Sequence, residues 1–252
     1  FSRRYRGVVL TDEGRLLYDH VSEAFEALNE GEEKLKRSIE LGVGQLKIGV
    51  SSTLCKYMLL PYLKEFIHRN PHISISIECQ STNETLKLLD DDKIDIGLIG
   101  KPTSLKTFNF YYLDNIEDIF VTTKDYLRNL SARGVKKSEI LQNSTLMLLD
   151  KGNMTRKYID DYLQENQIHV KDSIDISNMD LLIDFAKIGV GVACVIKSIV
   201  SKELADGTLI EIPLGIPIHK REVGFAYKES SKLSTSLQTF IKFYESYTPE
   251  DF

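Results

Sequence analysis

The chain has 252 residues, of which 32 are lysine or arginine and 37 are aspartate or glutamate, giving a formal net charge of −5. Its 42% hydrophobic and 27% charged residues are typical of globular proteins, which excludes wholesale disorder and leaves enough core for one large or two medium domains. No stretch approaches about eighteen consecutive apolar residues, so we expect no membrane-spanning helix.

The three cysteines, Cys55, Cys79 and Cys194, are widely spaced and form no Cys-x-x-Cys motif. This usage favours a reducing cytosol and argues against a structural zinc site. The first residues also lack the apolar segment and the small-residue cleavage site of a signal peptide. We therefore expect a cytoplasmic protein that needs no metal and no cofactor.

The acidic chain opens on a basic segment, in which Arg3, Arg4 and Arg6 lie within the first six residues. On composition alone, a solvated terminus is the simplest interpretation of such a cluster. Composition alone does not decide whether the cluster has a function.

A long helix is predicted over residues 12–40. Thr11 is a good N-cap, and Asp12 and Glu13 place negative charge in the first turn. Small or apolar residues then recur at heptad spacing, at Leu17, Val21, Ala24, Leu28, Gly31 and Leu35. A helix of this length spans roughly 44 Å, which is too long to bury its stripe on its own small domain. The seam predicts a partner helix in a dimer, with packing on the rest of the chain as the alternative.

Beyond Gly42 and Gly44 the pattern changes to alternating strands and helices. Strands are predicted over residues 45–50, 72–79 and 94–100, and helices over 53–69, where Pro61 opens the longer second part, and 82–92, capped by Thr82 or Asn83. The rhythm repeats with strands over 144–150, 173–177 and 190–196, helices over 155–166 and 179–189, and a last strand and helix over 222–228 and 236–247.

Strands that alternate with helices imply parallel sheets wound through right-handed crossovers. We predict an α/β fold of two Rossmann-like lobes, joined by residues near 110–124. Such lobes form a hinge and a central cleft at the carboxyl ends of their strands.

The sequence contains no recognisable catalytic constellation. None of the five histidines pairs with another at metal-ligand spacing, and no Gly-x-Ser-x-Gly, His-Glu-x-x-His or phosphate-loop motif is present. We therefore expect a protein that is not an enzyme.

Uncharged polar residues recur where predicted strands meet helix N-termini. They lie at residues 51–53, 81–83, 152–155 and 177–178. A helix N-terminus offers unpaired N–H groups and a partial positive charge, so turns of this kind that converge on a cleft bind a small anion. Each turn taken alone is explained equally well as an ordinary N-cap. Arg156, Lys101 and Lys197 are cations that could also reach the cleft.

Several segments, in order along the chain, match one known family. The opening FSRRYRGVVLTDEGRLL resembles the wing and helix start of LysR-type transcriptional regulators, through Phe1, Arg3, Arg6, Leu10, Thr11 and Gly14. The resemblance continues through Gly44, Leu46, Ile48, Gly49, Leu60, Pro61, Phe66 and Pro71, and through the segments DKIDIGLIG and AKIGVGVACVIKSIV. Lys197 stands where the family commonly has proline, and the helix-turn-helix that precedes the wing in the family is not in the sequence, so we expect a fragment of a longer chain.

The resemblance implies three parts. Residues 1–11 are a remnant of the winged-helix wing, residues 12–41 a dimerisation helix, and residues 42–252 a periplasmic-binding-protein-like effector domain, with lobe I at about 45–120 and 226–252 and lobe II at about 121–225. The arginines then contact DNA phosphates, which positions the protein without reading sequence. The candidate effector-binding residues are Ser51, Ser52, Thr53, Ser81, Thr82, Asn83, Gly100, Thr155 and Asn178.

The function that we expect is a ligand-responsive, DNA-binding transcriptional regulator whose cleft takes a small anionic metabolite. The expected partners are DNA, the effector, a second copy in a homodimer or homotetramer, and RNA polymerase, with no membrane. A solute-binding protein of a transporter, which shares the two-lobed fold, is the alternative. An enzyme on the same fold lacks any candidate base or electrophile.

Overall fold

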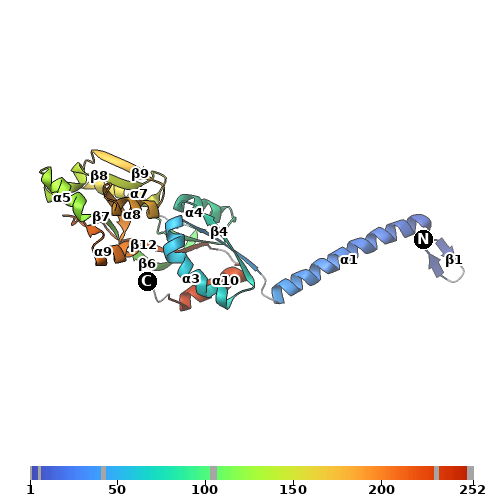
Figure 1. Ribbon diagram of the computed structural model, residues 1–252. Coiled ribbons are helices and arrows are strands. Elements are labelled where there is room, and N and C mark those ends of the chain that lie inside the picture. The colour runs from blue at the N-terminus through green and yellow to red at the C-terminus, as the bar shows by residue number, and fades with distance from the viewer. Residues whose placement is uncertain (1, 5–6, 41–43, 103–106, 230–232, 249–252) are drawn as a thin grey trace.

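The computed structural model describes residues 2–4, 7–40, 44–102, 107–229 and 233–248. The chain begins with an antiparallel hairpin of β1 (Ser2–Arg4) and β2 (Gly7–Val9), followed by α1 (Asp12–Glu40). Thr11 Oγ1 accepts the backbone N–H of Gly14 at 3.1 Å, so the predicted helix and its cap are both confirmed. Figure 1 shows α1 extending away from a two-lobed body, with the hairpin at its far end.

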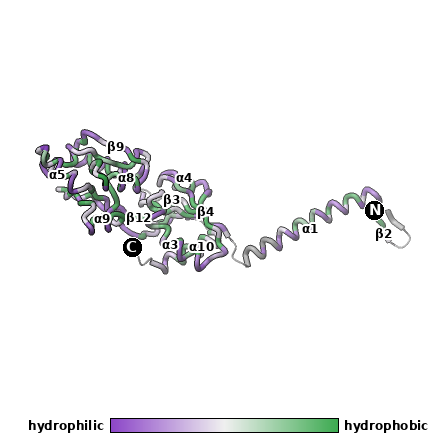
Figure 2. Tube along the Cα trace, in the orientation of Figure 1, coloured by the Kyte–Doolittle hydropathy of each residue, from purple (hydrophilic) through white to green (hydrophobic). Residues whose placement is uncertain are grey.

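The apolar residues of α1 do not pack on the rest of the chain. Leu17, Val21 and Leu28 are 66%, 43% and 68% exposed, and Ala24 is exposed as well. Figure 2 shows hydrophobic positions recurring along this isolated helix. The side chain of Leu35 and those of Arg3 and Arg4 lie outside the described part of the structure, as does Arg6 altogether. Packing of the seam on its own chain, the alternative considered above, is therefore wrong for Leu17, Val21, Ala24 and Leu28.

The first lobe is built on a five-stranded sheet of order β4-β3-β5-β12-β6. Its strands are β3 (Gly44–Val50), β4 (Ile73–Cys79), β5 (Ile96–Gly100), β6 (Phe108–Ile116) and β12 (Arg221–Lys228). Its helices are α2 (Ser52–Leu54), a π-helical turn (Cys55–Leu59), α3 (Leu60–Arg69), α4 (Thr82–Asp90) and α10 (Thr235–Ser246).

The second lobe is built on a five-stranded sheet of order β11-β7-β10-β8-β9. Its strands are β7 (Asp118–Thr122), β8 (Thr145–Leu149), β9 (Asp172–Ile176), β10 (Val192–Ile196) and β11 (Ile210–Glu211). Its helices are α5 (Lys124–Ala132), α6 (Ile140–Asn143), α7 (Met154–Glu165), α8 (Met179–Lys187) and α9 (Ser201–Asp206), with short 3₁₀ turns at Lys137–Glu139 and Lys197–Val200.

Both sheets are mixed, so the prediction of parallel sheets holds only for the strands that alternate with helices. In the first sheet β3 pairs in parallel with β4 and β5, whereas β12 is antiparallel to both β5 and β6. In the second sheet β7 is antiparallel to β10 and β11. The antiparallel strands are those through which the chain passes between the lobes, because a strand that arrives from the other lobe enters the sheet without a helical crossover.

Residues 110–124, expected as a connection, consist largely of two strands. β6 belongs to the first sheet and β7 to the second, and only Glu117 separates them. The return crossing leads into β12, where Arg221 pairs with Ile116. The two crossings therefore lie side by side where the lobes meet.

Each lobe buries an apolar core against its sheet. In the first lobe, Leu46, Ile48 and Val50 of β3 have no exposed surface. The centres of the Phe66 ring on α3 and the Phe240 ring on α10 are 4.9 Å apart. The carboxyl ends of β3, β4, β8 and β9 lead directly into helix N-termini. This arrangement places polar turns from both lobes at the junction between them.

Candidate functional site

Four of the turns at the strand ends are N-caps with a side-chain acceptor. Ser51 Oγ accepts the N–H of Leu54 and Ser81 Oγ that of Glu84, both at 3.3 Å. Asn153 Oδ1 accepts the N–H of Thr155 and Asn178 Oδ1 that of Leu181, both at 2.9 Å. The ordinary interpretation of each turn as a cap is therefore confirmed.

Two predicted caps are displaced along the chain. The helix expected from Thr53 is capped by Ser51, and the helix expected from Thr82 or Asn83 is capped by Ser81. Both serines keep extended backbone, with ψ of 153° and 160°, so each helix starts immediately after its serine. Thr53 and Thr82 lie inside the first turn, and their hydroxyls are not needed for capping.

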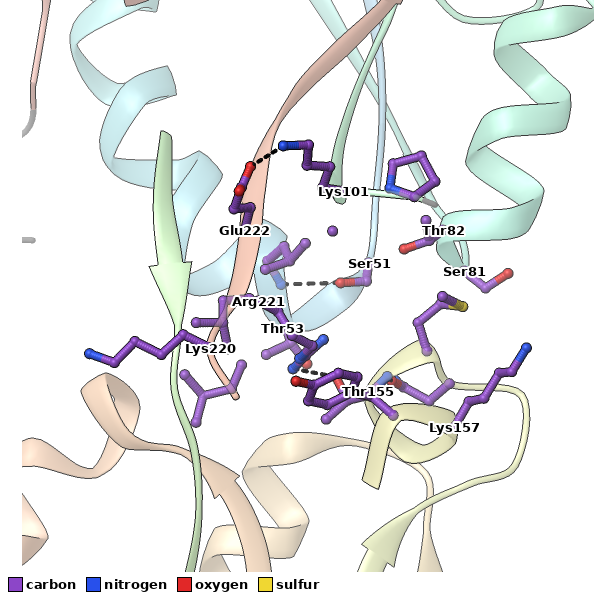
Figure 3. Close-up of a pocket in the computed structure, with 18 of the residues that line it drawn as sticks. Ser51, Thr53, Ser81, Thr82, Lys101, Thr155, Lys157, Lys220, Arg221 and Glu222 are labelled. Carbon is purple, nitrogen blue, oxygen red and sulfur yellow. Dashed lines mark hydrogen bonds and ion pairs between the residues drawn. The ribbon is translucent and has the colours of Figure 1, made fainter. Parts of the chain in front are cut away.

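A cavity of about 470 Å³ lies between the lobes. It brings together six of the predicted residues, namely Ser51, Thr53, Ser81, Thr82, Gly100 and Thr155. Ser52, Asn83 and Asn178 do not line it: Ser52 and Asn83 are exposed, and the side-chain oxygen of Asn178 is used in its cap. Figure 3 shows Ser51 and Thr82 of the first lobe on one side of this cavity and Thr155 of the second lobe on the other.

Arg221 is a cationic group that lines the cavity, and the sequence did not point to it. Its Nε and Nη2 atoms donate to the two carboxylate oxygens of Asp118 at 2.8 and 2.9 Å, and Nη2 also donates to Thr155 Oγ1 at 3.2 Å. The guanidinium carbon lies 5.1 Å from the centre of the Tyr158 ring. Within the described part of the chain no acceptor is recorded for Nη1, so this side of the guanidinium is available to a ligand.

Asp118 fixes the orientation of the Arg221 guanidinium by accepting two hydrogen bonds from it. Its side chain is fully buried, whereas that of Arg221 is 16% exposed. Burial raises the pKa of the Asp118 carboxyl, and the Arg221 guanidinium partly offsets that rise. Because Asp118 lies on β7 and Arg221 on β12, the pair joins the two segments through which the chain crosses between the lobes.

The comparison with known proteins identifies the family. The sequence profile described as LysR substrate binding domain matches residues 40–248. The chain belongs to this family. The membership supports a ligand-responsive LysR-type transcriptional regulator over a solute-binding protein of a transporter, which was the alternative.

Individual relatives agree with the assignment. The HTH-type transcriptional regulator YeiE of Escherichia coli is 23% identical over 244 residues, covering 96% of this chain and 80% of YeiE. The regulatory domain of Synechocystis CcmR, solved in complex with 2-PG, is 19% identical with a TM-score of 0.67, covering 79% of this chain and 95% of that domain. A full-length OxyR variant from Pseudomonas aeruginosa is 18% identical with a TM-score of 0.69, covering 96% of this chain and 83% of OxyR. The two solved structures show that the LysR-type fold, with its two mixed α/β lobes, is that of this chain.

The remaining cations of this LysR-type cavity differ in how far they are already paired. Lys101 Nζ lies 2.5 Å from Glu222 Oε2, and Lys220 Nζ lies 2.9 Å from Glu117 Oε2. Figure 3 shows the Lys220 side chain pointing away from the hydroxyl groups. Lys157 lines the cavity and has no carboxylate within 4.0 Å among the described residues, so it remains free to meet an anion.

Two of the three cations that could have reached the cleft do not line it. Arg156 is 7% exposed, and its guanidinium donates to Asp160, Asp175 and the carbonyl oxygen of Leu149. Lys197 lies 3.2 Å from Glu117 and 3.0 Å from Glu211. Neither possibility is realised, because carboxylates of the second lobe and of the crossing segments hold these side chains elsewhere.

The groups that line the cavity are suited to binding a small anion. Hydroxyl groups, the N-termini of α2, α4 and α7, the free side of Arg221 and Lys157 all offer hydrogen bonds or positive charge to an anion. Asp161 and Glu222 add acidic groups to the lining, so the cavity also has acceptors for the hydroxyl groups of a ligand. Among the described residues, no cluster of three or more histidine, cysteine, aspartate or glutamate side chains is arranged to hold a metal, and no helix there is long and apolar enough to cross a membrane.

Proposed function

We propose that the chain senses a small anionic metabolite in the inter-lobe cavity and thereby controls the DNA binding of a transcriptional regulator. One observation carries the proposal: Ser51, Thr53, Ser81 and Thr82 of one lobe and Thr155 of the other line the same cavity as Arg221. A ligand that contacts both walls binds one separation of the lobes better than others. Such differential affinity is what an effector needs in order to change a conformation.

The cavity favours a small ligand with one or two negative charges. A carboxylate or phosphate group meets one of the cations, Arg221 Nη1 or Lys157, and the hydroxyl groups of the opposite wall donate to the rest of the molecule. The 2-PG complex of CcmR supports a small molecule as the ligand of this fold. Transcriptional regulators among the relatives support a binding protein rather than an enzyme.

The helix α1 is proposed to form the dimer through the exposed faces of Leu17, Val21, Ala24 and Leu28, continued by Leu35. In the whole regulator we propose a homodimer or homotetramer in the cytoplasm, in which Arg3, Arg4 and Arg6 contact DNA phosphates. Contact with RNA polymerase belongs to the same proposal. The exposure of the seam supports the dimer, since large apolar side chains at heptad spacing are stabilised by a partner helix.

A charge in the middle of this seam is expected to weaken self-association at least tenfold, which corresponds to about 1.4 kcal/mol. Leu28→Glu would bury an unpaired carboxylate between the two helices, which is unfavourable. Sedimentation over a range of concentrations measures the change, and circular dichroism checks that both lobes stay folded. The control is Glu26→Lys, which changes a charge off the seam. Equal mass distributions for Leu28→Glu and the unaltered chain would show that the seam does not drive assembly.

The cavity is tested with inorganic sulfate as a probe for an oxyanion ligand. Ser51→Ala is expected to lower the free energy of unfolding by about 1 kcal/mol through loss of the cap. Thr53→Ala is expected to change the free energy of unfolding less than Ser51→Ala does. It is expected to weaken sulfate binding by about 1–3 kcal/mol, the cost of a lost charge-assisted hydrogen bond or of the partner left unpaired. Calorimetric titration at constant ionic strength measures affinity, and urea denaturation measures stability.

Ser138→Ala, at an exposed position outside the cavity, is the control for both measurements. Unchanged sulfate affinity in Thr53→Ala would mean that this hydroxyl takes no part in anion binding. Absence of any sulfate binding to the unaltered chain would contradict the proposed ligand class.

A further inference from the structure

A second contact joins the lobes on elements separate from the crossing segments. The Tyr57 hydroxyl donates to Asp180 Oδ1 at 2.5 Å, and Lys56 Nζ lies 2.6 Å from the same oxygen. Lys56 and Tyr57 belong to the π-helical turn of the first lobe, and Asp180 belongs to the first turn of α8 in the second. One carboxylate oxygen of the second lobe thus holds two donors of the first.

The sequence positions of these groups couple them to the cavity. Lys56 follows Thr53 by three residues in the short helical segment whose N-terminus lines the cavity. The π-helical turn interrupts the regular hydrogen bonding between α2 and α3, and such turns recur at functional sites. Asp180 lies just after the cap residue Asn178, where the N-terminus of α8 stabilises its negative charge. The hydrogen bond from Lys56, followed by that from Tyr57, lowers the pKa of the Asp180 carboxyl.

The strength of the contact suits a reversible connection. The side chains of Lys56 and Asp180 are 54% and 48% exposed, so their ion pair by itself contributes little. Tyr57 is half-buried, and its hydrogen bond to an ionised acceptor is of the stronger, charge-assisted kind. The contact can therefore hold the lobes in the absence of ligand and still be broken by a modest change in their separation.

We propose that Lys56, Tyr57 and Asp180 form an inter-lobe clasp that holds the two walls of the cavity at the spacing in which both contact a ligand. In this proposal the lobes rotate about the crossing segments at Glu117 and Arg221, and the second contact fixes the angle between them. Asp180 and Tyr57 are then positioning residues for effector binding, although neither lines the cavity. The effect on ligand affinity rests on the function proposed above, whereas the effect on lobe separation does not.

The clasp predicts a specific pattern of affinities for the sulfate probe. Tyr57→Phe and Asp180→Asn each lower the population of the binding-competent spacing, and apparent affinity falls in proportion to that population. We expect sulfate affinity to fall about threefold to tenfold in each variant, the range that one net hydrogen bond covers. The double variant is expected to bind no more weakly than Asp180→Asn alone, because both changes break the same contact. Asp184→Asn, one turn further along α8 and 3.8 Å from Lys187, is the matched control.

A second measurement needs no ligand. Backbone hydrogen exchange of residues 52–59 and 179–187 is expected to be faster in Tyr57→Phe and in Asp180→Asn than in the unaltered chain, and unchanged in Asp184→Asn. Unchanged exchange in both clasp variants overturns the clasp. Faster exchange with unchanged sulfate affinity overturns its role in binding. Faster exchange in a chain that does not bind sulfate at all leaves the clasp supported and refutes the proposed ligand class instead.

Discussion

Replacing Arg221 with methionine is expected to lower the free energy of unfolding by about 3–5 kcal/mol, the cost of leaving a buried charge without its partner. Asp118 has no exposed side-chain surface, so no water can replace the guanidinium that donates to both of its oxygens. Methionine has a similar length and fills the space, which limits the loss to electrostatics and hydrogen bonding. Urea denaturation near neutral pH measures the change.

Substitution of the partner carboxylate, Asp118→Asn, is expected to lower the free energy of unfolding less than Arg221→Met does. In Asp118→Asn the Arg221 side chain keeps an acceptor oxygen and, being 16% exposed, also has access to solvent from the cavity. The double variant Arg221→Met/Asp118→Asn should recover part of the stability lost in Arg221→Met, because no buried charge remains. Equal losses in the two single variants would contradict the asymmetry that their burial predicts.

The pH dependence of Arg221→Met provides a further check on the same pair. Burial already raises the pKa of Asp118, and removal of Arg221 takes away the effect that opposes the rise. A carboxyl whose pKa is higher in the folded than in the unfolded state binds a proton on folding, so stability falls as pH increases through the raised pKa. The deficit of Arg221→Met relative to the unaltered chain should therefore shrink on going from about pH 8 to about pH 5. A deficit that is independent of pH would show that Asp118 stays ionised without Arg221.

Local pattern was enough to predict most of the helices and the central strands. The strand over residues 45–50 and the helix over residues 12–40 have strong apolar periodicities, which depend only on neighbours in the sequence. β6 and β7 were missed for a physical reason. Most of β6 is half-buried or exposed, so it lacks a clear alternation, and only Glu117 separates it from β7, so no turn residues mark the boundary.

In the candidate site, too, the residues with a local sequence signal were predicted and those that depend on distant parts of the chain were not. Ser51, Ser81 and Thr155 were predicted because a polar residue between a strand and a helix is a local signal. Arg221 and Asp118 are 103 residues apart, and no local pattern links the arginine that starts β12 to the aspartate that starts β7. The contact of Tyr57 with Asp180 spans 123 residues and is invisible to sequence patterns for the same reason.

The close approach of β6 and β12 sets the position of Arg221 and leads to the second large expected effect. A Cβ atom added at Gly224 of β12 would overlap the carbonyl oxygen and carbon of Tyr111 in β6, which are backbone atoms and cannot rotate away. The pairing also shifts register between Val223 and Gly224, which marks a bulge at this point. Only glycine lets the two strands pair here at this distance.

Gly224→Ala is therefore expected to lower the free energy of unfolding by about 3 kcal/mol, at the upper end of the usual range for overpacking. Because the strands must move apart three residues from Arg221, sulfate affinity should fall together with stability. Gly100→Ala on the neighbouring strand β5 is the matched control for stability, since a Cβ atom there meets no atom within 4 Å. Urea denaturation of the two variants separates the cost of the close approach from the general cost of replacing a glycine in this sheet. If both variants unfold at the same urea concentration as the unaltered chain, β6 and β12 can separate freely, and their contact does not hold Arg221 in the cavity.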